Sequence, residues 1–150
     1  MIDLTKLLST FFYIGYFPFA PGSVASFAGI IICYLLKDSP LIYGAVFVII
    51  TLLGFMAAGK MEKLVGKKDP SCVVIDEVSG VMIAFFMLPF RWPVVLSAFF
   101  LFRAFDMFKI YPCNKLEALH GGAGIMMDDI VAGIYTMITM QIALRLAGQF

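Results

Sequence analysis

Five of the ten acidic residues of this 150-residue chain fall in three short clusters beside apolar segments. The clusters are Asp76-Glu77, Asp106 and Asp128-Asp129. An ionised carboxylate at the margin of a membrane span is costly unless it is paired or binds a cation. Mg²⁺ prefers oxygen ligands of this kind and bridges them to substrate phosphates. The clusters therefore predict a cation site, and we expect the chemistry of the protein to occur there.

Two basic residues accompany the middle cluster. Arg103, Asp106 and Lys109 are spaced i, i+3, i+6, so a helix would carry them near one face. This spacing fits a site in which Asp106 binds a metal and the two cations bind phosphate oxygens. An intrahelical ladder of ion pairs is the alternative interpretation.

The other two clusters lie where helices are expected to begin. Asp128-Asp129 follow the glycine-rich residues 121–124. Capping explains only one of these two acids, because neighbouring side chains diverge by ~100° on a helix. Asp76-Glu77 follow a loop that contains a proline, and stabilisation of the helix dipole is the alternative interpretation for them.

Two further polar residues are candidates for binding substrate. Ser23 ends the loop of residues 18–22, where its side chain could cap a helix or backbone amides could receive a phosphate. His120, just before the glycines, could be a ligand, a general acid or a satisfied polar side chain.

The composition indicates a membrane protein. Hydrophobic residues make up 62% of the chain and charged residues 14%, whereas a soluble domain carries about 45 to 50% and about 25%. The mean hydropathy is +0.99. The length favours one domain, residues 1–150, and the net charge of +1 without a basic stripe does not favour nucleic-acid binding.

Five apolar stretches predict an all-α integral membrane bundle with about four to five membrane-embedded helices. Several are shorter than the roughly 20 residues that a complete crossing takes. The first 14 residues are expected to form an interfacial helix. The apolar stretches are residues 23–36, 41–58, 73–90, 94–108 and 130–147.

The basic residues predict the orientation of the bundle if each stretch crosses once. The side with more basic residues is placed in the cytoplasm. All three acidic clusters fall on that side, at about the level of the lipid phosphates. Lys37, Arg91 and Arg145 fall on the opposite side, and the richer side holds Lys6, Lys60, Lys63, Lys67, Lys68, Arg103, Lys109 and Lys115.

These residues resemble the motifs of the phosphatidylglycerophosphatase A family of bacterial membrane phosphatases. The resemblance covers residues 18–23, 74–77, 102–109 and 120–133, of which the last block is the most specific. It implies an all-α bundle in the bacterial inner membrane and a requirement for Mg²⁺. The metal and catalytic residues that it implies are Asp76, Glu77, Asp106, Asp128 and Asp129.

The activity that the resemblance implies is hydrolysis of phosphatidylglycerophosphate to phosphatidylglycerol and phosphate, in phospholipid biosynthesis. We expect one or two Mg²⁺ ions to activate water while Arg103 and Lys109 neutralise charge on the phosphoryl group. An aspartyl-phosphate intermediate is an alternative. The residues themselves do not distinguish one lipid phosphate monoester from another.

Two other functions are compatible with clustered acids in a membrane. A small transporter or channel for divalent cations would use them as a permeation site, but it would place them near the middle of the bilayer. Such a protein would have no need of Arg103 and Lys109 beside the acids. A structural membrane subunit would pair its charges internally, and neutralising Asp129 would then spoil folding rather than activity.

Overall fold

The computed structural model describes residues 3–116 and 118–149, and this part of the chain contains helices and no strand. The predicted all-α class is therefore confirmed. In chain order the elements are α1 (Leu4–Ser9), the 3₁₀ helix η1 (Ile14–Tyr16), α2 (Pro21–Leu36), α3 (Pro40–Val65), α4 (Ile75–Ala84), α5 (Trp92–Phe108), α6 (Cys113–Leu116) and α7 (Gly122–Leu146).

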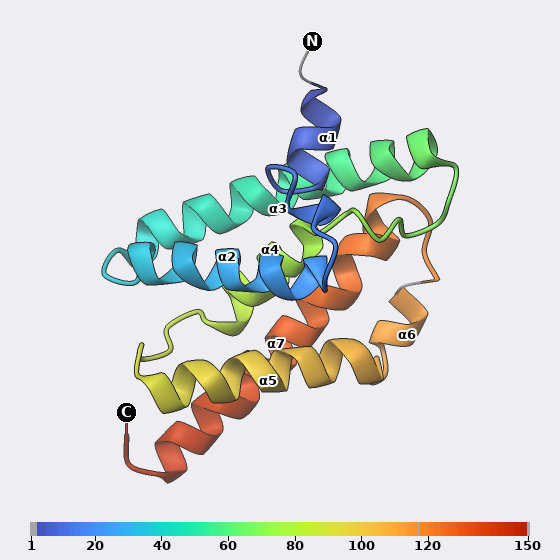
Figure 1. The fold of residues 1–150 in the computed structure, drawn as a ribbon. Helices are drawn as coiled ribbons and strands as arrows, with labels where there is room; N and C mark the ends of the chain where they lie inside the picture. Colours follow the sequence, from blue (N-terminus) through green and yellow to red (C-terminus); the bar gives the residue numbers. More distant parts are fainter. Residues whose placement is uncertain (1–2, 117, 150) are drawn as a thin grey trace.

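The short helix α4 is the centre of the bundle. Eight of its ten residues are buried, including Val78, Val81 and Met82. Helices α2, α3 and α7 pack around α4, and α5 packs mainly on α7. Figure 1 shows α2 and α5 running in opposite directions beside each other, with α7 passing obliquely behind α5.

Two glycines let α4 and α7 touch backbone to backbone. A Cβ atom on Gly133 would lie 2.3 Å from the carbonyl oxygen of Gly80. A Cβ atom on Gly80 would lie 2.7 Å from the carbonyl oxygen of Asp129. Small residues permit this close approach between helices, which places the acidic part of α7 directly beside α4.

Three of the predicted spans have different bounds in the structure. The stretch 41–58 continues as α3 to Val65, seven residues past its predicted end. The stretch 73–90 is helical only over α4, because the chain turns at residues 85–91, where Met87 has a φ of 58° and Pro89 follows. Ten residues rise about 15 Å, which is half of the ~30 Å hydrocarbon core. Helix α7 begins at Gly122, eight residues before the predicted start at residue 130, and includes the acidic pair.

The N-terminal segment is not the single helix of 14 residues that we expected. Helix α1 ends at Ser9 because Phe11, Phe12 and Tyr13 all adopt left-handed backbone conformations. The segment then packs on the loop that enters α4, where the Ser9 carbonyl accepts a hydrogen bond from Val74 N at 3.0 Å. The N-terminal segment therefore holds in place the loop that positions Asp76 and Glu77.

Large apolar side chains cover the outer faces of the long helices. A soluble monomer rarely exposes so large an apolar surface. Of the described helices, α3 and α7 are long and apolar enough to cross a membrane. The exposed side chains include Phe27, Ile31 and Leu35 on α2, Leu41, Val48, Ile49 and Leu52 on α3, Trp92, Leu96 and Phe100 on α5, and Ile138 and Ile142 on α7.

Candidate active site

Three helices bring the five motif acids into one cleft. Asp76 and Glu77 lie in the first turn of α4, and Asp106 lies in the last turn of α5. Asp128 and Asp129 lie in the second turn of α7. The cleft contains about 510 Å³ of empty space, part of it open to the outside. The three clusters thus meet at one end of the bundle. The sequence predicted that all three would lie on the same side of the membrane.

Three of the acids form a compact group of oxygen donors. One carboxylate oxygen each from Asp106, Asp128 and Asp129 lies within 4.8 Å of the others. Asp128 is only 7% exposed and Asp129 only 4% exposed, so little water is available to stabilise their charges. Ionised groups at such depth need a cation close to them.

Asp76 has an oxygen atom without a protein partner. Its Oδ1 is buried and accepts no hydrogen bond within the described part of the chain. The dipole of α4 favours a negative charge at this position, but it does not supply the missing partner. A ligand in the cleft would supply it.

Glu77 is engaged by the protein itself. Arg103 Nη1 donates to both carboxylate oxygens of Glu77, at 2.6 and 2.5 Å, and Ser26 Oγ donates to Oε2 at 3.1 Å. A Cβ atom on Gly22 would lie 2.2 Å from Glu77 Oε1, so a side chain at this position would displace the carboxylate. Arg103 also pairs with Asp106, at 3.1 Å.

Lys109 reaches the third cluster from the end of α5. It is the C-cap residue and adopts a left-handed conformation with a φ of 44°. Its Nζ atom lies 3.3 Å from Asp128 Oδ2. The Arg103–Asp106 pair is the contact that an ion-pair ladder along α5 would make. Both cations, however, also bind acids on other helices, so they join the three clusters.

The capping interpretation of the acidic pair on α7 is wrong. The N-cap of α7 is Gly121, and Asp128 and Asp129 lie well inside the helix. Asp128 Oδ1 accepts a hydrogen bond from the backbone of Asp129 at 3.1 Å. Packing of α7 against α4, rather than capping, explains why both acids are buried.

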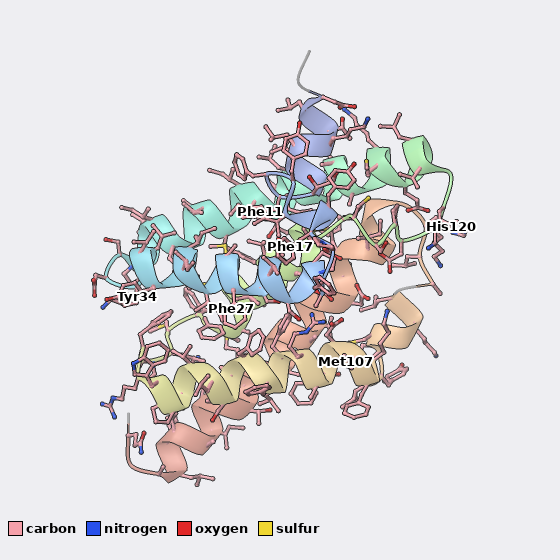
Figure 2. All side chains as sticks on the ribbon, viewed as in Figure 1. Phe11, Phe17, Phe27, Tyr34, Met107 and His120 are labelled. Atoms are coloured by element: carbon pink, nitrogen blue, oxygen red, sulfur yellow. The ribbon has the colours of Figure 1, made fainter. Side chains whose placement is uncertain are left out.

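Ser23 and His120 do not belong to the described residues that line the cleft. Ser23 lies in the first turn of α2, but the N-cap of that helix is Ala20, and no side chain caps it. His120 is exposed in the segment before α7 and projects from the edge of the molecule in Figure 2. The polar residues that lie beside the acids in the cleft are therefore different from these two.

Four residues that the sequence did not single out contribute to the site. Asp69 and Ser71 line the cleft from the loop before α4, and Gly22 lines it from α2. Ser26 binds Glu77. Gly22 and Ser26 are four residues apart, so helical periodicity places them on one face and could have identified Ser26 as a candidate.

Cys113 lies near the acids but is not suited to act as a nucleophile. Burial raises the pKa of the Cys113 thiol, and the charge of Asp128 raises it further. The thiolate is the nucleophilic form of cysteine. The thiol therefore stays protonated at neutral pH, and the carboxylates are left as the reactive groups of the cleft.

The residues of the cleft fit Mg²⁺. The five motif carboxylates and Asp69 lie beside Arg103 and Lys109, which leaves an excess of four negative charges when all are ionised. All the acidic donors are hard oxygen atoms, which Mg²⁺ prefers. The unpartnered oxygen of Asp76 and the three close oxygens of the other clusters are available to it.

Comparison with known proteins identifies the family of this chain. The family model described as Phosphatidylglycerophosphatase A matches residues 7–144. The chain belongs to the phosphatidylglycerophosphatase A family. The match includes all five acids together with Arg103 and Lys109, so the whole cleft lies within the part of the chain that defines the family.

Two relatives carry the family name. A Phosphatidylglycerophosphatase A of Escherichia coli is 36% identical over an alignment of 131 positions, which covers 85% of this chain and 76% of the relative. One of Haemophilus influenzae is 37% identical over an alignment of 146 positions, which covers 93% of this chain and 88% of the relative.

A third relative carries a different name. It is a protein of Bacteroides thetaiotaomicron, provisionally named a phosphatidylinositol-3-phosphatase. It is 40% identical over an alignment of 154 positions, which covers 97% of this chain and 96% of the relative. No solved structure matches the chain.

Proposed function

We propose that the protein is a Mg²⁺-dependent lipid phosphatase that hydrolyses phosphatidylglycerophosphate to phosphatidylglycerol and phosphate. The observation that carries the proposal is the single cleft in which five carboxylates lie beside Arg103 and Lys109. Such a cleft can hold a metal and a phosphate together. The names of the Escherichia coli and Haemophilus influenzae relatives support the choice of substrate.

The protein would work as a multi-pass protein of the bacterial inner membrane, with its cleft at the cytoplasmic side. Helices α3 and α7 would cross the bilayer, while α2 and α5 would lie within it. Helix α5 begins at the exposed Trp92 and rises roughly 25 Å over its 17 residues, close to the ~30 Å of the hydrocarbon core. Exposed Tyr16 and Phe17 near the start of α2 would lie at the headgroup level.

Asp76, Asp106, Asp128 and Asp129 would hold Mg²⁺, which when bound polarises a phosphoryl oxygen and lowers the pKa of bound water. The protein's own cations would neutralise the phosphoryl group. Arg103, held in place by Glu77, would bind its oxygens from one side, and Lys109 from another. Positioning and electrostatics of this kind supply most of the catalysis in phosphoryl transfer.

The reaction could proceed by direct attack of water or through an aspartyl-phosphate. Rapid-quench measurement of enzyme-bound phosphate distinguishes them. We expect direct attack, because the acids are engaged by neighbouring cations or suited to the metal. Acid-stable labelling of one aspartate by the substrate phosphate would establish the covalent route instead.

The decisive experiment measures phosphate release by the purified protein in detergent. Phosphatidylglycerophosphate would be supplied with Mg²⁺ or with EDTA, to wild type and to Asp76→Asn, Asp106→Asn and Asp129→Asn variants whose folding is verified by thermal unfolding. We expect EDTA and each substitution to lower kcat/KM at least ~100-fold. Release that is insensitive to all four treatments would refute the proposed function.

A second substrate belongs in the same assay. The name of the Bacteroides relative favours phosphatidylinositol 3-phosphate as a candidate. Phosphatidic acid serves as a lipid phosphate monoester without a polyol headgroup. We expect the highest kcat/KM for phosphatidylglycerophosphate, and a higher value for phosphatidylinositol 3-phosphate would assign the protein to that activity instead.

The arrangement of charges does not favour a cation transporter. A permeation site would lie near the middle of the bilayer, whereas these acids gather at the ends of α4 and α5 and in the second turn of α7. Arg103 and Lys109 are bound to the acids themselves. Fixed cations at these positions would oppose the passage of a divalent cation.

A further inference from the structure

Helices α2 and α5 both contribute to the acidic cleft at one end, and they form a groove at their other end. Gly22 of α2 and Asp106 of α5 line the cleft. Because the two helices run in opposite directions, their other ends meet again at the far side of the bundle (Figure 1). There they form an open groove with about 860 Å³ of space, lined by Ile30, Ile31, Tyr34, Phe90, Trp92 and Val95.

The groove and the acidic cleft lie along the same helix pair. Between them Phe27 of α2 stacks on Phe99 of α5, with ring centroids 4.8 Å apart. Figure 2 shows Phe27 and Tyr34 on the side of α2 that faces α5. Beyond this pair, Tyr34 contacts Phe90 edge to face, with ring centroids 5.7 Å apart. Aromatic contacts therefore continue along α2 and α5 from the middle of the helix pair into the groove.

We propose that the α2–α5 groove holds one acyl chain of the lipid whose phosphate is bound in the acidic cleft. This inference rests on the proposed function. Helix α2 rises about 1.5 Å per residue, so Ile30 and Tyr34 lie roughly 12 and 18 Å along the axis from Gly22. A long acyl chain that starts at the headgroup level spans this distance, whereas a hexanoyl chain is too short to do so.

The continuity with the cleft is what selects an acyl chain as the occupant. A second apolar groove is lined by Pro40, Leu41, Gly44, Ala45, Val48 and Ile49, all on α3. Helix α3 contributes no described residue to the lining of the acidic cleft, whereas α2 and α5 each contribute one. The α2–α5 groove orients the lipid rather than attracting it, because bilayer tails are as apolar as its walls. Orientation of the headgroup toward the acids is therefore the effect to measure.

The first test fills each groove with a tryptophan. Ile31 is 60% exposed, so Ile31→Trp obstructs the α2–α5 groove without disturbing the core. Ala45→Trp is the matched control in the α3 groove. Hydrolysis of dioleoyl and dihexanoyl phosphatidylglycerophosphate would be measured in mixed micelles. We expect Ile31→Trp to lower kcat/KM at least about tenfold for the dioleoyl lipid only, and Ala45→Trp to change neither value.

The outcomes separate this inference from the proposed function. If wild type hydrolyses both lipids and Ile31→Trp leaves their ratio unchanged, the acyl-chain proposal is wrong and the phosphatase proposal stands. If Ile31→Trp lowers both values equally and converts a dimer to a monomer, the groove is covered by a second copy, which also overturns the proposal. If wild type hydrolyses neither lipid, the proposed function fails.

A binding measurement tests the groove without turnover. Trp92 lines the groove and is the single tryptophan of the chain, so intrinsic fluorescence reports on this position. Asp129→Asn protein in nanodiscs would be given phosphatidic acid or phosphatidylcholine, each brominated near the chain ends, at equal mole fractions. We expect stronger quenching by the phosphatidic acid, reversed by its unbrominated form. Equal quenching by both lipids would show ordinary surrounding lipid in the groove and would refute the proposal.

Discussion

The contacts of Glu77 differ from those expected of a metal ligand. The family resemblance implied a metal ligand, but Arg103 and Ser26 engage its carboxylate oxygens. Glu77 is therefore better placed to position Arg103 than to bind a metal directly. Ser26 is the residue through which this role can be tested with the least disturbance, because it touches Glu77 without lining the cleft.

We predict that Ser26→Ala lowers kcat/KM roughly tenfold, since a hydrogen bond to a charged group contributes about 1.5–3 kcal/mol. Ser23→Ala, one turn earlier on α2, is the matched control and is expected to have little effect. Ser26→Thr, which keeps the hydroxyl, should restore part of the activity. Steady-state kinetics at saturating Mg²⁺ provide the measurement. A larger loss in Ser23→Ala than in Ser26→Ala would contradict the assignment.

The unpartnered oxygen of Asp76 leads to a prediction about stability rather than activity. We expect Mg²⁺ to raise the Tm of wild type, because a ligand at 100 times its Kd stabilises the folded state by about 2.7 kcal/mol. Asp76→Asn should shrink this shift and leave the Tm in EDTA equal to or above that of wild type, since it removes a buried charge.

Asp38→Asn is the control for this experiment, because Asp38 is exposed in the turn between α2 and α3. Its Mg²⁺-induced shift in Tm should match that of wild type. An undiminished shift in Asp76→Asn would show that Asp76 does not contribute to the cation site.

At the scale of the elements, the crossing of α4 and α7 determines where two of the three clusters meet. Gly80 and Gly133 permit the contact, and Asp129 lies on α7 one turn before Gly133. We predict that Gly133→Ala destabilises the protein by about 1–3 kcal/mol, as overpacking does in cores, and lowers activity by moving the acidic pair. Thermal unfolding and phosphate release would be compared in the same preparation.

Gly44→Ala on α3 provides the matched control. A Cβ atom there meets nothing within 4 Å, and alanine favours helix by up to about 1 kcal/mol relative to glycine. Its stability should equal or exceed that of wild type. Wild-type stability and activity in Gly133→Ala would instead show that the two helices can separate without moving the site.

Local sequence predicted some helix bounds better than others. Helices α2 and α5 agree closely with the predicted stretches, because each begins with a proline in its first turn and has a largely apolar body. The end of α3 and the bounds of α4 and α7 were missed. Hydropathy continues past Ala84 although the backbone turns, and residues 122–129 are helical although glycines and acids interrupt their apolar pattern.

At the scale of the whole molecule, the proposed topology places the two ends of α3 on opposite sides of the membrane. We predict that Asp38→Cys reacts with a membrane-impermeant maleimide in intact bacterial cells. Lys68→Cys, in the loop before α4, should react only in inside-out vesicles. Both residues are exposed in the structure, so differences in labelling report on sidedness.

Cys72→Ser serves as the background for this labelling, because Cys33 and Cys113 are buried whereas Cys72 is partly exposed. Labelling of both positions from the same side would show that α3 does not cross the bilayer. Reaction of Lys68→Cys in intact cells alone would reverse the predicted orientation and place the acidic cleft outside.

The sequence by itself determined the helical class, the apolar character and the five acids with their two cations, since composition and short motifs carry these properties locally. Only the tertiary structure decided which neighbours each acid contacts. The contacts between Glu77, Arg103 and Ser26, and the burial of Asp129 against α4, join residues from separate helices. Those contacts depend on how closely the helices pack, and no local pattern of residues records that distance.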